Sequence, residues 1–129
     1  MQVYYFTRTG RSKKIAEDLA AHHHVQAQKI DDGKNWGGAL GYVKAGFQSA
    51  SKKSGEAHYQ KPAGDETVLC VFPIWAGTFP PAVKTFVDEV GRERIIAIPT
   101  SLGSTLKDRD GFAKVIDLVG KSIDAPKDV

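Results

Sequence analysis

Apolar runs alternate along the chain with segments that have helical periodicity. Four runs predict β-strands, at residues 3–6, 25–30, 67–72 and 94–98. Because most of these runs are nearly continuous, they are typical of strands that are buried on both faces of a sheet. Pro73 and Pro99 follow the last two runs and are expected to end those strands.

The segments between these strands repeat apolar residues at the spacing of an α-helix. After the first strand, Ile15, Ala16, Leu19 and Ala20 share one face. Three further helices are predicted at residues 36–50, 80–91 and 112–120. Pro80 and Pro81 suit the first turn of the second of these helices, and Gly91 suits its end. Residues 51–66 are polar and predict a long loop.

This β-α-β-α-β-α-β-α order predicts the α/β class, with a parallel sheet covered by helices on both faces in a three-layer α/β/α sandwich. Nothing in the sequence divides residues 1–129, so one domain is expected. Ligands of such sheets bind beyond the carboxyl ends of the strands. The loops at residues 7–12, 73–79 and 100–105 therefore lie on the edge where a ligand is expected.

Composition narrows the class of protein. The chain has 129 residues, of which 41% are hydrophobic, and a formal net charge of +3. This charge is too small and too scattered to predict nucleic-acid binding. A single cysteine excludes an internal disulfide and a multi-thiolate metal site. The longest apolar stretch, residues 68–76, is too short to cross a bilayer, and no signal peptide follows Met1. A cytoplasmic protein is expected, with no membrane partner.

The first of the three loops has the features of an anion site. It carries the hydroxyls of Thr7, Thr9 and Ser12 around Gly10, and a helix begins there, with free N–H groups and a positive dipole end. Cations in a first helical turn are unfavourable by up to ~1 kcal/mol each, which a bound phosphate would offset. The cations at this helix start are Arg11, Lys13 and Lys14. The alternative is that Ser12 is only a helix cap and the cations are solvated.

Other phosphate-binding and catalytic motifs are excluded because the residues that they require are absent from this loop. The first strand is followed neither by G-x-G-x-x-G nor by G-x-x-x-x-G-K-[ST], so dinucleotide and nucleoside triphosphate sites are unsupported. A cysteine-dependent phosphatase would need cysteine where Thr7 stands, and a receiver domain would need acidic residues there.

Trp75 is the second candidate binding residue. It lies in the loop after the third strand beside Gly77 and Thr78, where its indole is placed to stack on a flat ligand. The alternative is a packing role. Together with the anion loop, Trp75 favours a ligand that has a phosphate at one end and a ring at the other.

These motifs resemble those of the flavodoxin family. Residues 7–12, Thr-Arg-Thr-Gly-Arg-Ser, are similar to its phosphate loop, T/S-x-T-G-x-T/S. Residues 73–78 with 80–86 resemble the segment along the isoalloxazine ring, residues 36–47 the second helix, and residues 100–104 the third flavin loop. The likeness spans residues 1–104 and implies the strand order 2-1-3-4. Members usually have five strands, and only four are predicted here. The fifth strand is therefore expected to be missing, or to be a short edge piece supplied by residues 122–129.

The resemblance implies that FMN is the cofactor. The residues implied to hold its phosphate are Thr7, Arg8, Thr9, Gly10, Arg11 and Ser12. Those implied to flank and close the ring are Ile74, Trp75, Ala76, Gly77, Thr100, Ser101, Leu102 and Gly103. No catalytic residue or metal ligand is expected.

The function expected from this resemblance is electron transfer with a redox partner protein or a small-molecule acceptor. Two alternatives are a flavin-dependent NAD(P)H or quinone reductase, whose substrate pocket a homodimer could complete, and an interaction module without a cofactor. Electron-carrier flavodoxins are typically strongly acidic, whereas this chain is slightly basic. The charge therefore weakens the carrier assignment more than it weakens the assignment of a flavin.

Overall fold

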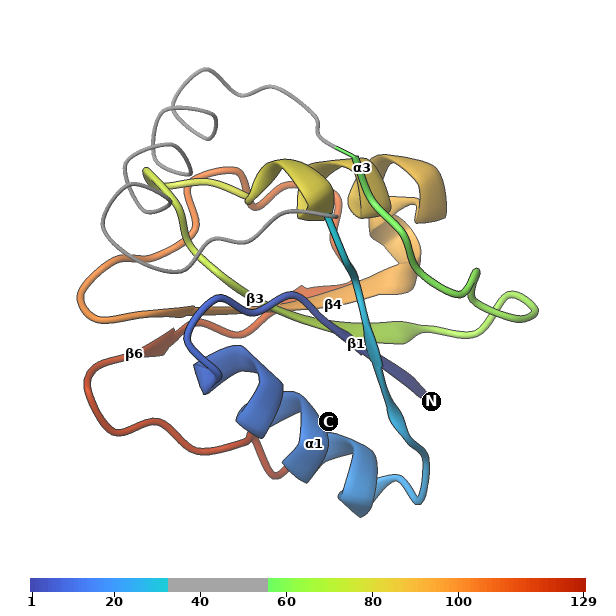
Figure 1. Ribbon diagram of the computed structural model, residues 1–129, viewed down its shortest axis with the longest axis horizontal. Helices are drawn as coiled ribbons and strands as arrows, with labels where there is room; N and C mark the ends of the chain where they lie inside the picture. Colours follow the sequence, from blue (N-terminus) through green and yellow to red (C-terminus); the bar gives the residue numbers. More distant parts are fainter. Residues whose placement is uncertain (33–55) are drawn as a thin grey trace.

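A parallel β-sheet with helices on both faces organises the chain in the computed structural model, which describes residues 1–32 and 56–129 (Figure 1). The strands are β1 (Gln2–Tyr5), β2 (Ala27–Lys29), β3 (Val68–Pro73), β4 (Ile95–Ser101), β5 (Lys114–Val115) and β6 (Leu118–Val119). Their order is β2-β1-β3-β4-β5, with β6 also paired to β4, and every pairing is parallel. The α/β class and the strand order 2-1-3-4 are thereby confirmed.

Two helices lie on opposite faces of this sheet (Figure 1). They are α1 (Arg11–His22) and α3 (Pro81–Val90), and a short 3-10 helix, η1 (Arg92–Arg94), follows α3. The sequence-predicted faces are buried: Ile15, Ala16, Leu19 and Ala20 on α1, and Val83, Phe86 and Val87 on α3. The helix predicted at residues 36–50 and the first part of the loop at 51–66 lie outside the described residues.

Alternation along β1 explains how one strand serves both layers. Val3 and Tyr5 pack in the cluster that contains α1, whereas Tyr4 and Phe6 pack in the cluster that contains Phe86 of α3. Successive strand residues point to opposite faces, so an unbroken apolar run is needed to fill both clusters.

The helix predicted at residues 112–120 is wrong, because this segment forms β5 and β6 instead. Its apolar residues fit a helical spacing, but several are β-branched and favour a strand. Lys114 pairs with Ile96, and Leu118 pairs with Thr100, so the segment supplies hydrogen bonds along the open edge of β4. A short fifth strand is therefore present, but it lies in the segment predicted as a helix and not at residues 122–129.

The expectation that Pro99 ends the fourth strand is also wrong, because β4 continues to Ser101. The register places Ala97 opposite Val115 and Thr100 opposite Leu118, so Pro99 faces the break between β5 and β6. Proline has no N–H to donate to a ladder. It is therefore tolerated where the neighbouring strand is interrupted.

The end of α1 carries a strained residue. Val25 N–H donates to the Ala20 carbonyl at 2.9 Å and His24 N–H to the Ala21 carbonyl at 3.2 Å, which is the pattern of a Schellman cap. His24 occupies the position that favours glycine, with a φ of 57°. The side chain of His24 is exposed, so its replacement removes little packing.

We therefore expect His24→Gly to raise the free energy of unfolding by about 1 kcal/mol, by relieving this conformation. Urea denaturation measures the change. His22→Gly is the matched control, since the same substitution inside the helix should lower stability by about 0.5–1 kcal/mol. A loss of stability in His24→Gly would contradict this account of the cap.

Candidate functional site

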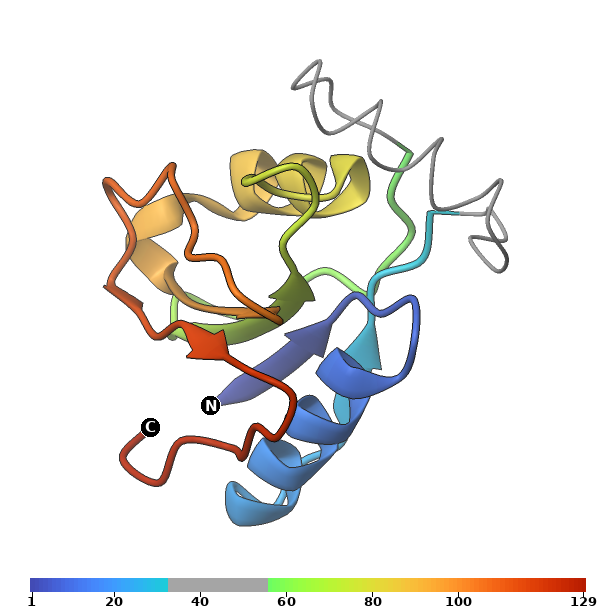
Figure 2. The same cartoon turned by 90° about the vertical axis from the view of Figure 1, so that its left-hand side faces the viewer.

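The loops that follow β1, β3 and β4 lie together at the carboxyl edge of the sheet, which faces the viewer in Figure 2. They line a cavity of about 330 Å³, which we call the loop cavity. Its lining residues are Thr7, Arg8, Thr9, Arg11, Ser12, Pro73, Ile74, Trp75, Thr100, Ser101, Leu102, Gly103 and Ser104. Most residues that the sequence singled out are thus brought together. Pro73 and Ser104 belong to the segments that resemble flavin loops, although they were not among the residues implied to hold FMN, whereas Gly10 was and does not line this cavity.

The first loop presents the start of α1 to this cavity. Gly10 N–H donates to Thr7 Oγ1 at 2.9 Å, and Gly10 takes a left-handed conformation with a φ of 96°. The helix begins at the next residue, so the N–H groups of its first turn have no intrahelical acceptor. That turn carries no acidic side chain. These donors and the helix dipole make the loop suited to an anion.

Basic side chains surround this helix start. Arg11 lines the loop cavity and donates a hydrogen bond to the Gly120 carbonyl, which anchors its guanidinium beside the loop. Lys13 and Lys14 are exposed on the same turn. A positive charge is unfavourable at a helix N-terminus unless an anion is bound there. The arrangement therefore favours a negatively charged ligand.

Two buried hydroxyls connect the first and third loops. Ser12 Oγ lies 3.0 Å from Thr100 Oγ1, and each residue is only 2% exposed. Thr100 Oγ1 is also 3.5 Å from the Phe72 carbonyl oxygen. The resemblance grouped Thr100 with the residues that close a ring, but the structure places it beside Ser12 of the anion loop.

The second loop contains Trp75, which is mostly buried. Only 8% of Trp75 is exposed, and its ring lies edge-on to Phe6, with 5.3 Å between the centroids. Trp75 belongs to the buried cluster that contains Phe86 of α3, and it also lines the loop cavity. Packing and ligand contact are therefore compatible at this position.

A tight turn separates Trp75 from a second cavity. Trp75 and Thr78 exchange backbone hydrogen bonds of 3.0 and 3.1 Å, while Ala76 and Gly77 have φ values of 52° and 82°. The sequence led us to expect Ala76 and Gly77 beside the ring, but neither residue lines the loop cavity. They line the second cavity, also of about 330 Å³, with Thr78, Phe79, Lys84, Lys107 and Asp108.

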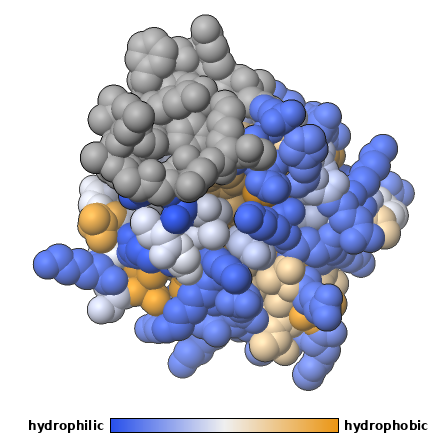
Figure 3. Space-filling model, in the orientation of Figure 1, coloured by the Kyte–Doolittle hydropathy of each residue, from blue (hydrophilic) through white to orange (hydrophobic). Residues whose placement is uncertain are grey.

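The third loop is closed by its own serines. Ser104 N–H donates to Ser101 Oγ at 2.9 Å, and Ser101 Oγ donates to the Ser104 carbonyl. The two residues between them are Leu102, which is 69% exposed, and Gly103. In Figure 3, apolar surface interrupts the polar surface on the side where the strands end. Leu102 thus gives the rim of the loop cavity an apolar contact.

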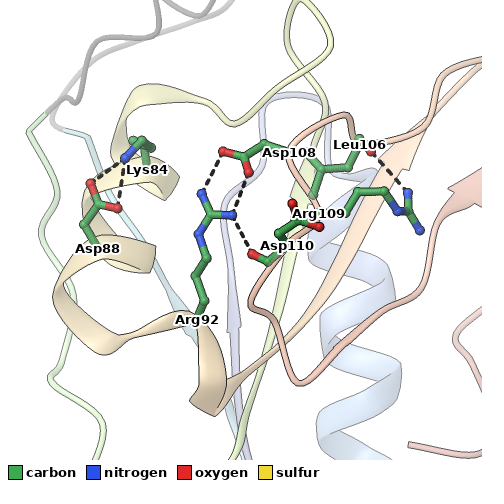
Figure 4. A network of polar contacts seen from close by, with 7 residues as sticks. All are labelled: Lys84, Asp88, Arg92, Leu106, Asp108, Arg109 and Asp110. Carbon is green, nitrogen blue, oxygen red and sulfur yellow. Dashed lines mark hydrogen bonds and ion pairs between the residues drawn. The ribbon is translucent and has the colours of Figure 1, made fainter.

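Arg92 holds the segment beyond this loop (Figure 4). Its guanidinium makes two hydrogen bonds of 2.7 Å to the Asp108 carboxylate and one of 2.8 Å to the Asp110 carbonyl. It also lies over the Phe79 and Phe112 rings, 5.5 and 4.9 Å from their centroids. Sequence reasoning missed this network, since its members are distant along the chain.

Arg92→Lys should lower the free energy of unfolding by about 1–2 kcal/mol, because lysine keeps the charge but loses the paired hydrogen bonds and the planar stacking. Urea denaturation measures the loss. Lys84→Gln is the control, since Lys84 pairs with Asp88 four residues along an exposed helix face, and this pair is worth at most about 0.5 kcal/mol. Equal effects of the two substitutions would show that the Arg92 network does not stabilise the fold.

A second anchor holds the segment from the other side. The Asp117 carboxylate lies at the break between β5 and β6, where it accepts a hydrogen bond from Leu106 N–H at 3.1 Å and pairs with Arg109 at 2.7 Å. Both anchors fix the residues that follow the third loop. The segment at residues 106–110, which borders the second cavity, is thereby attached to the rest of the fold.

Within residues 1–32 and 56–129, no group of three or more histidine, cysteine, aspartate or glutamate residues is placed to hold a metal ion. No helix in the same part of the chain has the length and apolar character needed to cross a membrane.

The chain matches no family profile. It is 33% identical over 97 residues to an uncharacterized protein of Archaeoglobus fulgidus, a match that spans 74% of this chain and 61% of that relative. The match therefore covers less than two thirds of the relative's length.

Solved structures establish the fold more firmly. A flavoprotein from Lactobacillus acidophilus NCFM, crystallised in complex with FMN, aligns over 92% of this chain and 90% of its own, with a TM-score of 0.68 and 19% identity. A candidate flavoprotein from Bacteroides eggerthii aligns over 95% and 89%, with a TM-score of 0.74 and 20% identity. A third, from Bacteroides uniformis, aligns over 94% and 90%, with a TM-score of 0.67 and 22% identity. The chain thus has the flavodoxin-like fold that its sequence predicted.

Proposed function

We propose that this protein binds FMN in the loop cavity and takes part in electron transfer. The observation that carries the proposal is the composition of this one cavity, which has an anion site at the start of α1 and apolar contacts at Trp75 and Leu102. Its volume falls within the usual range for small-molecule sites. Support also comes from the Lactobacillus acidophilus flavoprotein of the same fold, which was crystallised with FMN.

The phosphate end of the site is the better defined. Thr7, Thr9 and Ser12 supply hydroxyl donors, the first turn of α1 supplies backbone N–H groups, and Arg11 supplies a guanidinium. Such groups bind phosphate through charge-assisted hydrogen bonds. Ile74, Trp75 and Leu102 would cover the ring, and the serine-closed loop would hold its other side.

Bound flavin supplies the ability to accept and donate one or two electrons, whereas the protein binds, orients and shields it. Among the described residues that line the loop cavity, none carries a carboxylate, an imidazole or a thiol. Burial raises the pKa of the Cys70 thiol, which stays protonated inside β3. The lining therefore favours a cofactor as the reacting group. The redox partner, protein or small molecule, and a cytoplasmic location stay predictions.

The second cavity favours an alternative role as a flavin-dependent reductase. The turn Trp75–Thr78 lies between it and the loop cavity, and its polar lining residues are Thr78, Lys84, Lys107 and Asp108. A small acceptor bound there would lie across this turn from the proposed flavin. A steady-state assay with NADPH and a quinone separates the roles: turnover supports the reductase, and its absence, with reversible reduction of the bound flavin, supports the carrier.

The flavin itself is tested with the purified protein. We expect the protein stripped of ligand to regain a flavin absorption spectrum on addition of FMN, with a shift of the visible bands as the ring leaves water. Failure to take up FMN would refute the proposal and favour an interaction module without a cofactor.

A further inference from the structure

We infer that Thr100 is a positioning residue that directs the Ser12 hydroxyl toward the phosphate of the ligand, and that it thereby contributes to the preference for FMN over riboflavin. This inference rests on the proposed function of the loop cavity. It assigns Thr100 to the phosphate end of the site, although the sequence had grouped it with the ring.

The two hydroxyls come from different layers of the fold. Ser12 lies in the first turn of α1, and Thr100 lies near the carboxyl end of β4, 88 residues further along the chain. Both line the loop cavity, both are 2% exposed, and their oxygens are 3.0 Å apart. A buried hydroxyl that loses its partner has little access to water as a replacement.

The number of protons determines how this pair can respond to a ligand. Each hydroxyl has one proton to donate and lone pairs that accept. In the ligand-free arrangement, Ser12 can donate to Thr100 while Thr100 donates to the Phe72 carbonyl, at a long distance of 3.5 Å. When an acceptor-only phosphate dianion binds, Ser12 can donate to it if Thr100 turns its own proton toward Ser12.

This reorientation is inexpensive, because the bond given up among the described residues is the long contact from Thr100 to Phe72. The resulting chain runs from Thr100 to Ser12 to the ligand, and the donor bond from Thr100 strengthens the bond that Ser12 makes. The terminal hydroxyl of riboflavin can donate as well as accept, so it does not require this orientation.

The test is the affinity of the ligand-free protein for FMN and for riboflavin, measured by calorimetry on four single variants. Thr100→Val keeps the branched shape and removes the hydroxyl, and we expect it to lower FMN affinity about tenfold while riboflavin affinity changes less than about twofold. Thr100→Ser should restore the wild-type ratio of the two affinities. Thr85→Val is the control, since Thr85 Oγ1 bonds the Pro81 carbonyl on α3.

Ser12→Ala should lower FMN affinity to a similar extent, and adding Thr100→Val to it should cause no further loss, because Thr100 acts through Ser12. Thermal unfolding of each variant without ligand shows that it is folded. An unchanged ratio in Thr100→Val, or equal losses for FMN and riboflavin, would overturn the inference. Equal affinities for the two ligands in the wild-type protein would instead refute the phosphate site itself, and with it this role of Thr100.

Discussion

Trp75→Ala should weaken both the fold and the site: it should lower the free energy of unfolding by about 3 kcal/mol and FMN affinity at least about tenfold. The first effect follows from burial, since Trp75 is 8% exposed and packs against Phe6 in the core. The second follows from the loss of the aromatic surface that lines the loop cavity. Urea denaturation and calorimetric titration with FMN measure the two effects separately.

Trp75→Phe is the matched control, because it keeps an aromatic ring and should recover most of both losses. Quenching of tryptophan fluorescence by added FMN gives an independent measure when Trp36 is first replaced by phenylalanine, since the chain has two tryptophans. A destabilised Trp75→Ala protein that binds FMN as tightly as the wild type would show that Trp75 only packs and that the ring lies elsewhere.

Gly10→Val should abolish most FMN binding, with a loss of affinity well above tenfold if the phosphate lies at the start of α1. Gly10 does not line the loop cavity, and a Cβ there meets nothing within 4 Å, so the expected loss acts through the backbone. Valine disfavours the positive φ that places Gly10 N–H on Thr7 Oγ1 at the start of α1, and a distorted loop would present its donors poorly to a phosphate. Because a side chain at a φ of 96° is strained, valine should also lower the free energy of unfolding of the ligand-free protein by about 1–2 kcal/mol.

Gly10→Asn tests this cause. Asparagine adopts a positive φ more readily than valine, so the ligand-free protein should keep more of its stability and more of the loop geometry. We therefore expect Gly10→Asn to bind FMN more tightly than Gly10→Val, measured by calorimetry, and to show the smaller fall in unfolding free energy. Wild-type affinity in Gly10→Val would place the phosphate away from this loop.

The sequence predicted the fold correctly where a segment's pattern of apolar residues is compatible with a single type of secondary structure. The run at residues 3–6 must fill clusters on both faces of the sheet, and the spacing of Ile15 and Leu19 fits only one helix face. The segment at 112–120 was ambiguous, because its apolar residues suit both a helix and a strand. The outcome was decided by partners that the sequence does not show, namely the open edge of β4 and the contacts of Asp117.

The candidate site also has parts that the sequence could predict and parts that it could not. The anion loop could be predicted because its hydroxyls, its glycine and the helix start are consecutive in the chain. The contact of Thr100 with Ser12 could not, since it depends on how β4 and α1 meet in space. Ala76 and Gly77 were assigned to the ring by their position beside Trp75. Their positive φ values turn the chain so that they line the second cavity.

The central claim is that the loop cavity recognises a flavin by its phosphate, and it is tested most directly by calorimetric titration of the ligand-free wild-type protein with FMN and with riboflavin. Because charge-assisted hydrogen bonds contribute about 1.5–3 kcal/mol each, FMN should bind at least about tenfold more tightly. The preference should also fall as salt is added, since the anion site is partly exposed. Equal affinity for the two ligands, or no binding of either, would contradict the account.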